Sequence, residues 1–415
     1  MSIVRPFKGL RPKKDLAATV ASPPYDVLNS EEAREMAKGN PISFLHINKP
    51  EIDLPPETDP YDDAVYQQGR TNLERFIKED VFTRDDSPCF YLYAQTWGDH
   101  RQVGLVCGAS CQEYMEDKIK KHELTREKKE KDRIRHIESL GAQAGPVFLT
   151  YKAMSEIDKE LAVIQENDPD YDFTADDGIR HEFWVVQSKR RIEMITKLFE
   201  KVPSLYVADG HHRSASATII AQKRRDDPIY KEWTGAEPWN FMLAVLFPHD
   251  QMKILPYNRV VRDLNGLSAD EFMAKVEEKF YVSKADGAFE PNRTKLYGMY
   301  LDGRWYRLEA KNEIYDEDDV VDSLDVAILQ NNLLNPVLGI ENPRTDERID
   351  FVGGIRGTKE LERRVDSGEM KVAFSLHETT VEQLFAIADA GEIMPPKSTW
   401  FEPKLADGLV SLVLD

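Results

Sequence analysis

Short apolar runs bounded by turn residues recur along the chain and predict buried strands. Two pairs of runs are separated by tight-turn signals, Gly98-Asp99 and Asp302-Gly303. Asp-Gly readily supplies the positive φ of a hairpin turn, so each pair predicts a hairpin. The runs are residues 90–94, 103–107, 204–209, 241–247, 295–300 and 304–308.

Helical spacing of apolar residues alternates with these strands. Asn29 and Glu32 have the spacing of a capping box, so we expect a helix body over 31–38 that ends at Gly39-Asn40-Pro41. Residues 19–28, which include two prolines, are expected to be extended, and this places Asp26 on a rigid connection into that helix. Further helices are predicted at 64–82, 212–225, 319–334, 358–366 and 380–390, and further strands at 349–353 and 371–376.

The alternation predicts an α+β (mixed α/β) protein without an internal repeat. A chain of 415 residues exceeds one ordinary core, so two to three packed units are expected. The net charge of −19 argues against nucleic acid and anionic membranes as partners. The longest apolar run has seven residues, no secretory leader stands at the start, and three cysteines form no CxxC pair, so we expect a cytoplasmic enzyme with no membrane segment.

The segment Asp209-Gly210-His211-His212-Arg213 carries the clearest chemistry. It lies where an apolar strand passes into a helix whose first turn contains Ser214 and Ser216. A helix start presents backbone N–H groups to an anion, Gly210 permits close approach, and Arg213 can bind phosphate bidentately. Asp209 could bind a metal ion or a substrate hydroxyl. The alternative is that the two histidines only cap the helix and pack in the core.

Two other segments are weaker candidates. His122-Glu123-Leu124-Thr125-Arg126 lacks the second histidine of a zinc protease, so we interpret His122, Glu123, Arg126 and Arg133 as a polar arm at a substrate or phosphate pocket. A solvated charged helix is the alternative. Lys397, followed by two hydroxyl residues, could bind phosphate or carboxylate, or could be a solvated lysine at a strand edge. Phosphate-binding glycine loops of the P-loop and Rossmann types are absent.

The run from Val207 to Arg213 resembles the signature of the ParB/sulfiredoxin superfamily, in the form found in ADP-dependent free serine kinases. Across its length the chain is also similar to the domain of unknown function 1015 family. The matching stretches are Ser22-Pro23-Pro24-Tyr25-Asp26-Val27, His122-Glu123-Leu124-Thr125, the Asp209–Arg213 run and Met394-Pro395-Pro396-Lys397-Ser398-Thr399.

The resemblance implies a ParB/sulfiredoxin-like catalytic region over 1–255, with a large insertion at about 50–200, and an additional C-terminal α/β region over 256–415. It implies that Asp209, His211, His212 and Arg213 hold the phosphates of ADP or ATP and a Mg²⁺ ion. The kinases carry a catalytic glutamate near the N-terminus. No glutamate matches it here, and Asp26 is the nearest acidic candidate.

The leading hypothesis is therefore a Mg²⁺-dependent phosphotransferase on a small hydroxyl compound, with nucleotide and free L-serine or O-phosphoserine as substrates in either direction. Two alternatives stay open. One is a phosphomonoester hydrolase that uses the same residues, and the other is a nucleotide-dependent binding module without catalysis. A homodimer stays open as the oligomeric state.

Overall fold

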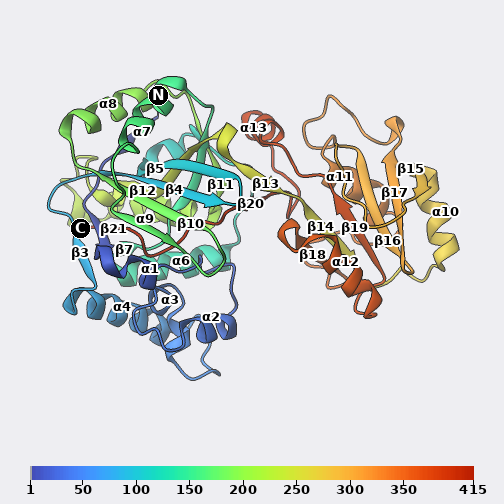
Figure 1. Ribbon diagram of the computed structural model, residues 1–415, viewed down its shortest axis with the longest axis horizontal. Helices are drawn as coiled ribbons and strands as arrows, with labels where there is room; N and C mark the ends of the chain where they lie inside the picture. The colour runs from blue at the N-terminus through green and yellow to red at the C-terminus, as the bar shows by residue number, and fades with distance from the viewer. Residues whose placement is uncertain (1) are drawn as a thin grey trace. The chain divides into compact units, whose positions relative to one another are not determined.

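The computed structural model describes residues 2–415, which form two compact units. Unit 1 runs to Met252 and takes in Pro403–Asp415, and unit 2 is Lys253–Glu402. The chain thus enters unit 2 once and returns from it once (Figure 1). Within residues 2–415, no helix combines the length and the apolar character needed to cross a membrane.

Unit 1 is built on a nine-stranded sheet in the order β6-β11-β8-β12-β5-β4-β10-β9, with β1 added to β5. β12 runs parallel to β8 and antiparallel to β5, and all its residues are buried, as its unbroken apolar sequence predicts. The strands are β1 Val4–Arg5, β4 Phe90–Trp97, β5 His100–Ser110, β6 Ile119–Lys120, β8 Val147–Tyr151, β9 Tyr171–Thr174, β10 Arg180–Val186, β11 Leu205–Asp209 and β12 Phe241–Pro248.

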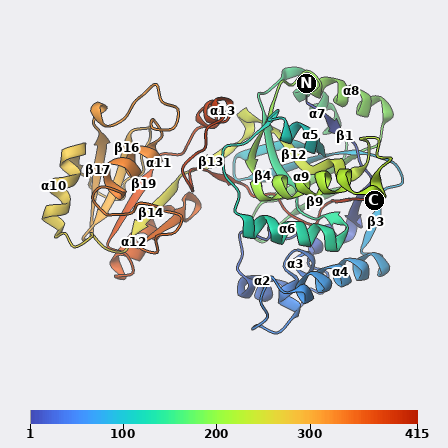
Figure 2. The same ribbon diagram turned by 180° about the vertical axis from the view of Figure 1, so that it is seen from behind.

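Helices surround this sheet. α6 packs against both α4 and α9, and α9 also packs against β12. Figures 1 and 2 show α2, α3 and α4 lying side by side next to α6. The helices are α1 Ala17–Val20, α2 Ser30–Ala37, α3 Leu45–Asn48, α4 Asp63–Lys78, α5 Cys111–Met115, α6 Glu127–Leu140, α7 Ser155–Ile164, α8 Lys189–Phe199 and α9 His211–Asp226.

A second, four-stranded sheet of unit 1 has the order β3-β2-β21-β7. Its strands are β2 Gly9–Pro12, β3 Phe82–Arg84, β7 Ala142–Gln143 and β21 Ser411–Val413. β21 pairs with β2 and β7, and this explains why the last residues of the chain, which we expected in the C-terminal region, belong to unit 1. Residues 50–200, expected as an insertion, supply β4, β5, β8 and β10 to the main sheet.

Unit 2 contains a six-stranded sheet in the order β15-β17-β16-β19-β14-β18 and the two-stranded ladder β13-β20. A cluster that includes Val260, Trp305 and Leu361 forms its core between the sheet and α12. Its strands are β13 Lys253–Leu255, β14 Tyr257–Val261, β15 Phe280–Lys284, β16 Leu296–Leu301, β17 Arg304–Ala310, β18 Ile349–Gly353, β19 Val372–Leu376 and β20 Trp400–Glu402. Its helices are α10 Ala269–Lys279, α11 Asp325–Leu329 with a π-helical turn at Gln330–Leu334, α12 Gly357–Asp366 and α13 Val381–Ala390.

The mixed α/β class is confirmed, as are both hairpins and the capping box of α2, in which Asn29 and Glu32 bond each other's backbone N–H groups. Three boundaries were wrong. Residues 17–20 make a helical turn that overlaps the start of the stretch expected to be extended, and α4 ends at Lys78 instead of residue 82. The helix expected over 319–334 begins only at Asp325, because the Asp319 carboxylate accepts the N–H groups of Val321 and Asp322 and closes a turn there.

Candidate functional site

The end of β11 and the start of α9 form the centre of the site. Gly210 separates them in the left-handed conformation, with φ of 95° and ψ of 31°, which glycine adopts without strain. Gly210 is the N-cap residue and offers no side chain to the helix. The N–H groups of the first turn, at His211, His212 and Arg213, therefore receive no capping side chain from the N-cap residue. The predicted strand-to-helix junction is confirmed.

Asp26 is brought to this junction from the connection before α2. Its Oδ1 atom lies 3.5 Å from Nη2 of Arg213. The Arg213 guanidinium also donates from Nη1 to the backbone oxygen of Pro146, at 2.8 Å. Tyr25 lies between two arginines, with its ring centroid 3.9 Å from Cζ of Arg133 and 5.2 Å from Cζ of Arg213. The sequence prediction that Asp26 and the 209–213 segment share one site is consistent with this geometry.

These side chains line one small cavity. It has a volume of about 20 Å³ and opens beside the first turn of α9. Two carboxylates and two cations face it, an arrangement suited to an anionic ligand that carries a cation or a hydroxyl group. The lining residues are Pro24, Asp26, Pro146, Phe148, Asp209, Gly210, Arg213, Lys404 and Leu405.

Lys404 is a site residue that the sequence analysis missed. Its Nζ donates to Oδ2 of Asp209 at 2.8 Å, while Oδ1 of Asp209 accepts the N–H of Gly210 at 2.8 Å. Burial raises the pKa of Asp209, but the positive charges of Lys404 and Arg213 outweigh burial and lower that pKa to about 2. Asp209 is therefore a carboxylate at neutral pH. Nothing in the local sequence around Lys404 signals this role, because only the return of the chain to unit 1 brings it here.

Asp407 is the second missed residue. Its side chain is fully buried, its Oδ2 accepts from Asn48, and its Oδ1 lies 3.8 Å from Nη1 of Arg213 without a hydrogen bond among residues 2–415. Burial raises the pKa of Asp407 to about 7, against the opposing charge of Arg213. Gly145 permits this approach, because a Cβ there would lie 2.9 Å from Asp407 Oδ1 and 3.2 Å from Arg213 Cζ.

His122 and His211 pack edge to face, with ring centroids 4.5 Å apart. They are 2% and 5% exposed, and neither nitrogen of His122 nor Nε2 of His211 makes a hydrogen bond in the described part of the chain. Burial lowers the pKa of His122 to about 4, against the opposing charge of Asp209, and burial lowers the pKa of His211 well below its usual range. Both rings are neutral at pH 7. Buried nitrogens without partners are uncommon, and such groups bind ordered water, an ion or a ligand, or take part in chemistry.

The remaining histidine of the motif, His212, is half-buried and contacts the predicted polar arm. Its Nε2 accepts the backbone N–H of Arg126 at 3.0 Å, so the imidazole is held against the start of α6. Burial lowers the pKa of His212, although Glu130 and Asp26 oppose that effect. Glu123 is exposed, with Oε2 4.0 Å from Nδ1 of His211. The residues of the arm thus reach the site mainly through backbone and histidine contacts.

Three residues that were predicted to bind phosphate have other contacts within the protein. Ser214 donates its hydroxyl to the backbone oxygen of Gly210 at 3.1 Å, and Ser216 donates to that of Glu130 at 3.3 Å, so both hydroxyls are engaged in helix packing. Lys397 belongs to unit 2, where its ammonium group lies 5.3 Å from the Tyr257 ring centroid.

Arg133 lies near the site without facing the cavity. Its guanidinium donates to Asp132 at 2.8 Å and stacks on the ring of Tyr25. Arg133 therefore supports the residues that line the cavity. No group of three histidine, cysteine or carboxylate side chains within residues 2–415 is arranged to hold a metal ion. A Mg²⁺ ion carried by a nucleotide needs only one or two protein carboxylates, and Asp209 fits that requirement.

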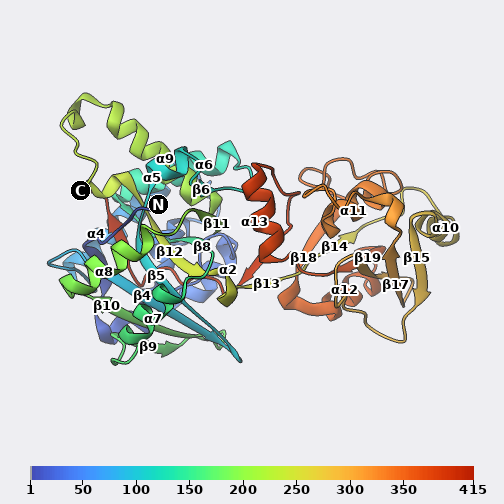
Figure 3. The ribbon, with the colours of Figure 1, turned by 90° about the horizontal axis from the view of Figure 1, so that it is seen from above.

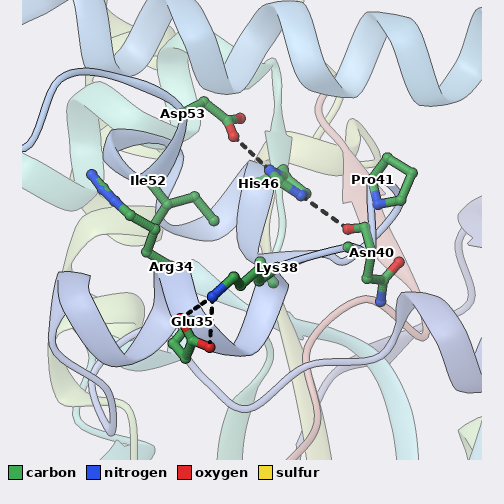
Figure 4. Close-up of a pocket in the computed structure, with 10 residues that line it drawn as sticks. Arg34, Glu35, Lys38, Asn40, Pro41, His46, Ile52 and Asp53 are labelled. Carbon is green, nitrogen blue, oxygen red and sulfur yellow. Dashed lines mark hydrogen bonds and ion pairs between the residues drawn. The ribbon is translucent and has the colours of Figure 1, made fainter.

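A second cavity, of about 520 Å³, lies among α2 and the residues that follow it (Figure 4). His46 bridges it, with Nδ1 2.7 Å from Oδ1 of Asp53 and Nε2 3.0 Å from the backbone oxygen of Asn40. Arg34 and the ion pair between Lys38 and Glu35 lie along the same cavity. None of the residues predicted for the catalytic site lies there.

The chain belongs to the family described as protein of unknown function (DUF1015), whose model matches residues 4–327. This confirms the family resemblance. No curated protein sequence matches the chain.

Solved structures with a similar arrangement include a free serine kinase in complex with AMP, which is 15% identical, has a TM-score of 0.34, and covers 69% of this chain and 84% of its own. Another is SbnI with a C-terminal truncation from Staphylococcus aureus, at 12% identity and a TM-score of 0.36, covering 70% of this chain and 82% of that one. A conserved hypothetical protein from Pyrococcus furiosus has 14% identity and a TM-score of 0.33, with 70% and 91% covered. Similarities at this level do not assign a function.

Proposed function

We propose that this protein is a nucleotide-dependent phosphotransferase that acts on a small hydroxyl compound, with free L-serine as the first acceptor to test. One observation carries the proposal. Asp26, Asp209, Arg213 and Lys404, which come from three distant parts of the sequence, line a single cavity beside the uncapped start of α9. Phosphoryl transfer needs this combination of cations for the phosphate and carboxylates for the hydroxyl group or a metal ion.

The phosphate would be bound at the first turn of α9. The helix start supplies N–H donors and the positive end of the helix dipole, and Gly210 places no side chain in front of them. Arg213 is held by Pro146 at one side and faces Asp26 at the other, so its orientation is fixed before a ligand arrives. A preorganised cation costs little reorganisation at the moment of reaction.

The two carboxylates would have different roles. Asp209 stays ionised, since its pKa is lowered to about 2 by Lys404 and Arg213 in spite of burial, and it would hold the Mg²⁺ ion of a nucleotide. Asp26 is exposed and lies at the mouth of the same cavity, where it would accept the proton of the attacking hydroxyl. The bound Mg²⁺ supplies neutralisation of the charge on the transferring phosphate.

L-Serine is the first acceptor because the Asp209–Arg213 run resembles that of free serine kinases. The test is a panel of free amino acids and hydroxy acids with ADP or ATP and Mg²⁺, followed by phosphorus NMR, together with O-phosphoserine and ADP for the reverse direction. We expect a phosphomonoester of one acceptor that forms only when nucleotide is present, and no product from Asp209→Asn.

The panel also separates the alternatives. Release of inorganic phosphate from O-phosphoserine without nucleotide would identify a hydrolase. Binding of ADP or ATP by calorimetry without any turnover across the panel would identify a binding module. Either result would contradict the phosphotransferase.

A further inference from the structure

We infer that Lys404 and Asp407, from the segment that returns from unit 2, complete the anion site of α9, with Lys404 as a phosphate-binding residue and Asp407 as a positioning residue for Arg213. The identity of the anion as a nucleotide phosphate rests on the proposed function. The segment lies outside residues 4–327, the part of the chain that the family model matches.

The backbone of this segment is fixed at three places by buried polar groups. Because a buried polar group is costly unless it is bonded, such anchors favour one conformation and keep the segment in register. The anchors are Gln95 Nε2 to the Lys404 oxygen at 2.8 Å, the Ala406 N–H to the Tyr93 hydroxyl at 3.3 Å, and the paired Ser22 and Asp407 backbones at 3.1 and 2.9 Å. Gln102 stabilises the first anchor, since its Nε2 donates to Oε1 of Gln95 at 3.0 Å.

Lys404 places its charge on the same cavity as Arg213. Its ammonium group bonds Asp209 at 2.8 Å, which keeps the long side chain directed at the start of α9. An ammonium group has three donors, so Lys404 can keep Asp209 and also bind a phosphate oxygen. Lys404 and Arg213, which are 191 positions apart in the sequence, would then both contact the anion.

Asp407 acts on the site through Arg213. A fully buried carboxylate beside a guanidinium is costly, and an apolar side chain of the same size would often be at least as stable there. The position of Asp407 accounts for a carboxylate at this place. Asp407 and the Pro146 oxygen fix one edge of the Arg213 guanidinium, and the other edge faces Asp26 and the cavity. Gly145 leaves the space that this arrangement needs.

The first test is calorimetric titration of Lys404→Met with ADP and with inorganic pyrophosphate. We expect both dissociation constants to rise at least about tenfold, as for loss of a charge-assisted hydrogen bond, and Lys404→Arg to restore part of the affinity. The matched control is Lys223→Met, on the exposed side of α9, which should bind as the wild type does. Equal affinities for Lys404→Met and the wild type would overturn the role of Lys404.

The second test is Asp407→Asn, which keeps the shape of the side chain and removes its charge. We expect pyrophosphate and ADP affinity to fall about threefold or more at pH 8, and the difference from the wild type to shrink towards pH 6, where Asp407 itself is protonated. The charged groups that face Asp407 are Arg213, Asp26 and Arg133. A variant that only melts at a lower temperature, with the wild-type pH dependence of affinity, would reduce Asp407 to a structural residue and overturn the inference.

Pyrophosphate separates this inference from the proposed function. If the wild type binds pyrophosphate but neither ADP nor ATP, the nucleotide proposal fails, and the comparison of Lys404→Met with the wild type still decides the inference. If the wild type binds none of the three anions, both fail. Circular dichroism of each variant shows whether the fold is retained.

Discussion

Asp26 and Arg213 are 187 positions apart in the sequence, and their Oδ1 and Nη2 atoms lie 3.5 Å apart. A carboxylate and a guanidinium at the edge of a cavity can separate to receive a phosphate and a hydroxyl group, because an ion pair that is partly exposed is weak. The pair therefore marks the position where both reacting groups would meet.

Arg213→Lys tests this position. Lysine keeps the charge but loses the planar fork that contacts Pro146 and Asp26, so affinity for ADP or ATP should fall by about 1–3 kcal/mol, and Arg213→Ala should lose more. Titration calorimetry measures these affinities, with Arg190→Lys on the exposed face of α8 as control. Indistinguishable affinities in the wild type and both Arg213 variants would place the phosphate elsewhere.

Asp209→Asn should leave the fold intact and lower turnover at least about a hundredfold, as expected when one charge of a preorganised site is lost. The amide can still accept the Gly210 N–H, but it no longer balances Lys404 or holds a cation. Circular dichroism and a turnover assay check both parts, with the exposed Asp176→Asn as control. Near-normal turnover in Asp209→Asn would show that the site has been assigned wrongly.

The local pattern of the sequence was sufficient to locate the strand and helix that carry the motif. The apolar run before Asp209 and the glycine after it predict β11, the turn and α9, and the structure has them within a residue or two. Lys404 and Asp407 could not be predicted in this way. Their segment has no distinctive pattern, and its place depends on a long-range pairing, Ser22 with Asp407, that only the folded chain forms.

Ser214 and Ser216 are the opposite case. The sequence predicted them as phosphate ligands, and in the structure their hydroxyls donate to backbone oxygens. Small hydroxyl residues in the first turn of a helix are typical of phosphate sites, but the same hydroxyls can bond nearby backbone oxygens. The sequence does not distinguish these two outcomes for Ser216, because its contact depends on which face of α9 packs against α6.

Gly145→Ala should weaken anion binding without a large loss of stability. Its Cβ would come within 2.9 Å of Asp407 Oδ1 and 3.2 Å of Arg213 Cζ, so one of the two side chains must move. We expect a lower affinity for ADP and pyrophosphate by calorimetry and a melting temperature within a few degrees of the wild type. Gly287→Ala, where the added Cβ meets no atom within 4 Å, is the control. Unchanged affinity in Gly145→Ala would mean that the approach of Asp407 to Arg213 does not matter for binding.

The bridge at His46 predicts a pH dependence of stability. The hydrogen bond to Asp53 raises the pKa of His46 despite partial burial. Burial raises the pKa of Asp53, but His46 and Asn72 outweigh burial and lower it. The stabilisation from His46 is therefore complete below its unfolded pKa of about 6.5 and is lost as pH rises through the higher folded value. The stabilisation from Asp53 is present above its unfolded pKa of about 3.9, and it is lost as pH falls through the lower folded pKa.

The free energies of unfolding of the wild type and His46→Gln, measured in urea, should thus differ most between about pH 4.5 and 6. They should converge at higher pH, where the wild-type imidazole has lost its proton. A neutral glutamine can still donate to one acceptor, which keeps the variant folded. His100→Gln, at the half-buried start of β5, is the control for loss of a histidine. A difference that stays constant from about pH 4.5 to about pH 8 would show that the pKa of His46 is the same in the folded and the unfolded protein.

His122→Phe separates packing from chemistry in the buried histidine pair. Neither nitrogen of His122 makes a hydrogen bond among residues 2–415, so phenylalanine removes two unsatisfied polar atoms and keeps a flat ring against His211. Replacing an unsatisfied buried polar group by an apolar one of similar shape is close to neutral or stabilising, so the melting temperature should stay within a few degrees of the wild type or rise. Binding or turnover should nevertheless fall, because His122 lies near Asp209 and both of its nitrogens are unsatisfied among residues 2–415. Thermal unfolding together with ADP titration and the NMR assay measures both quantities on one preparation. A His122→Phe protein that is as stable and as active as the wild type would show that the pair is only core packing and that the site ends at the first turn of α9.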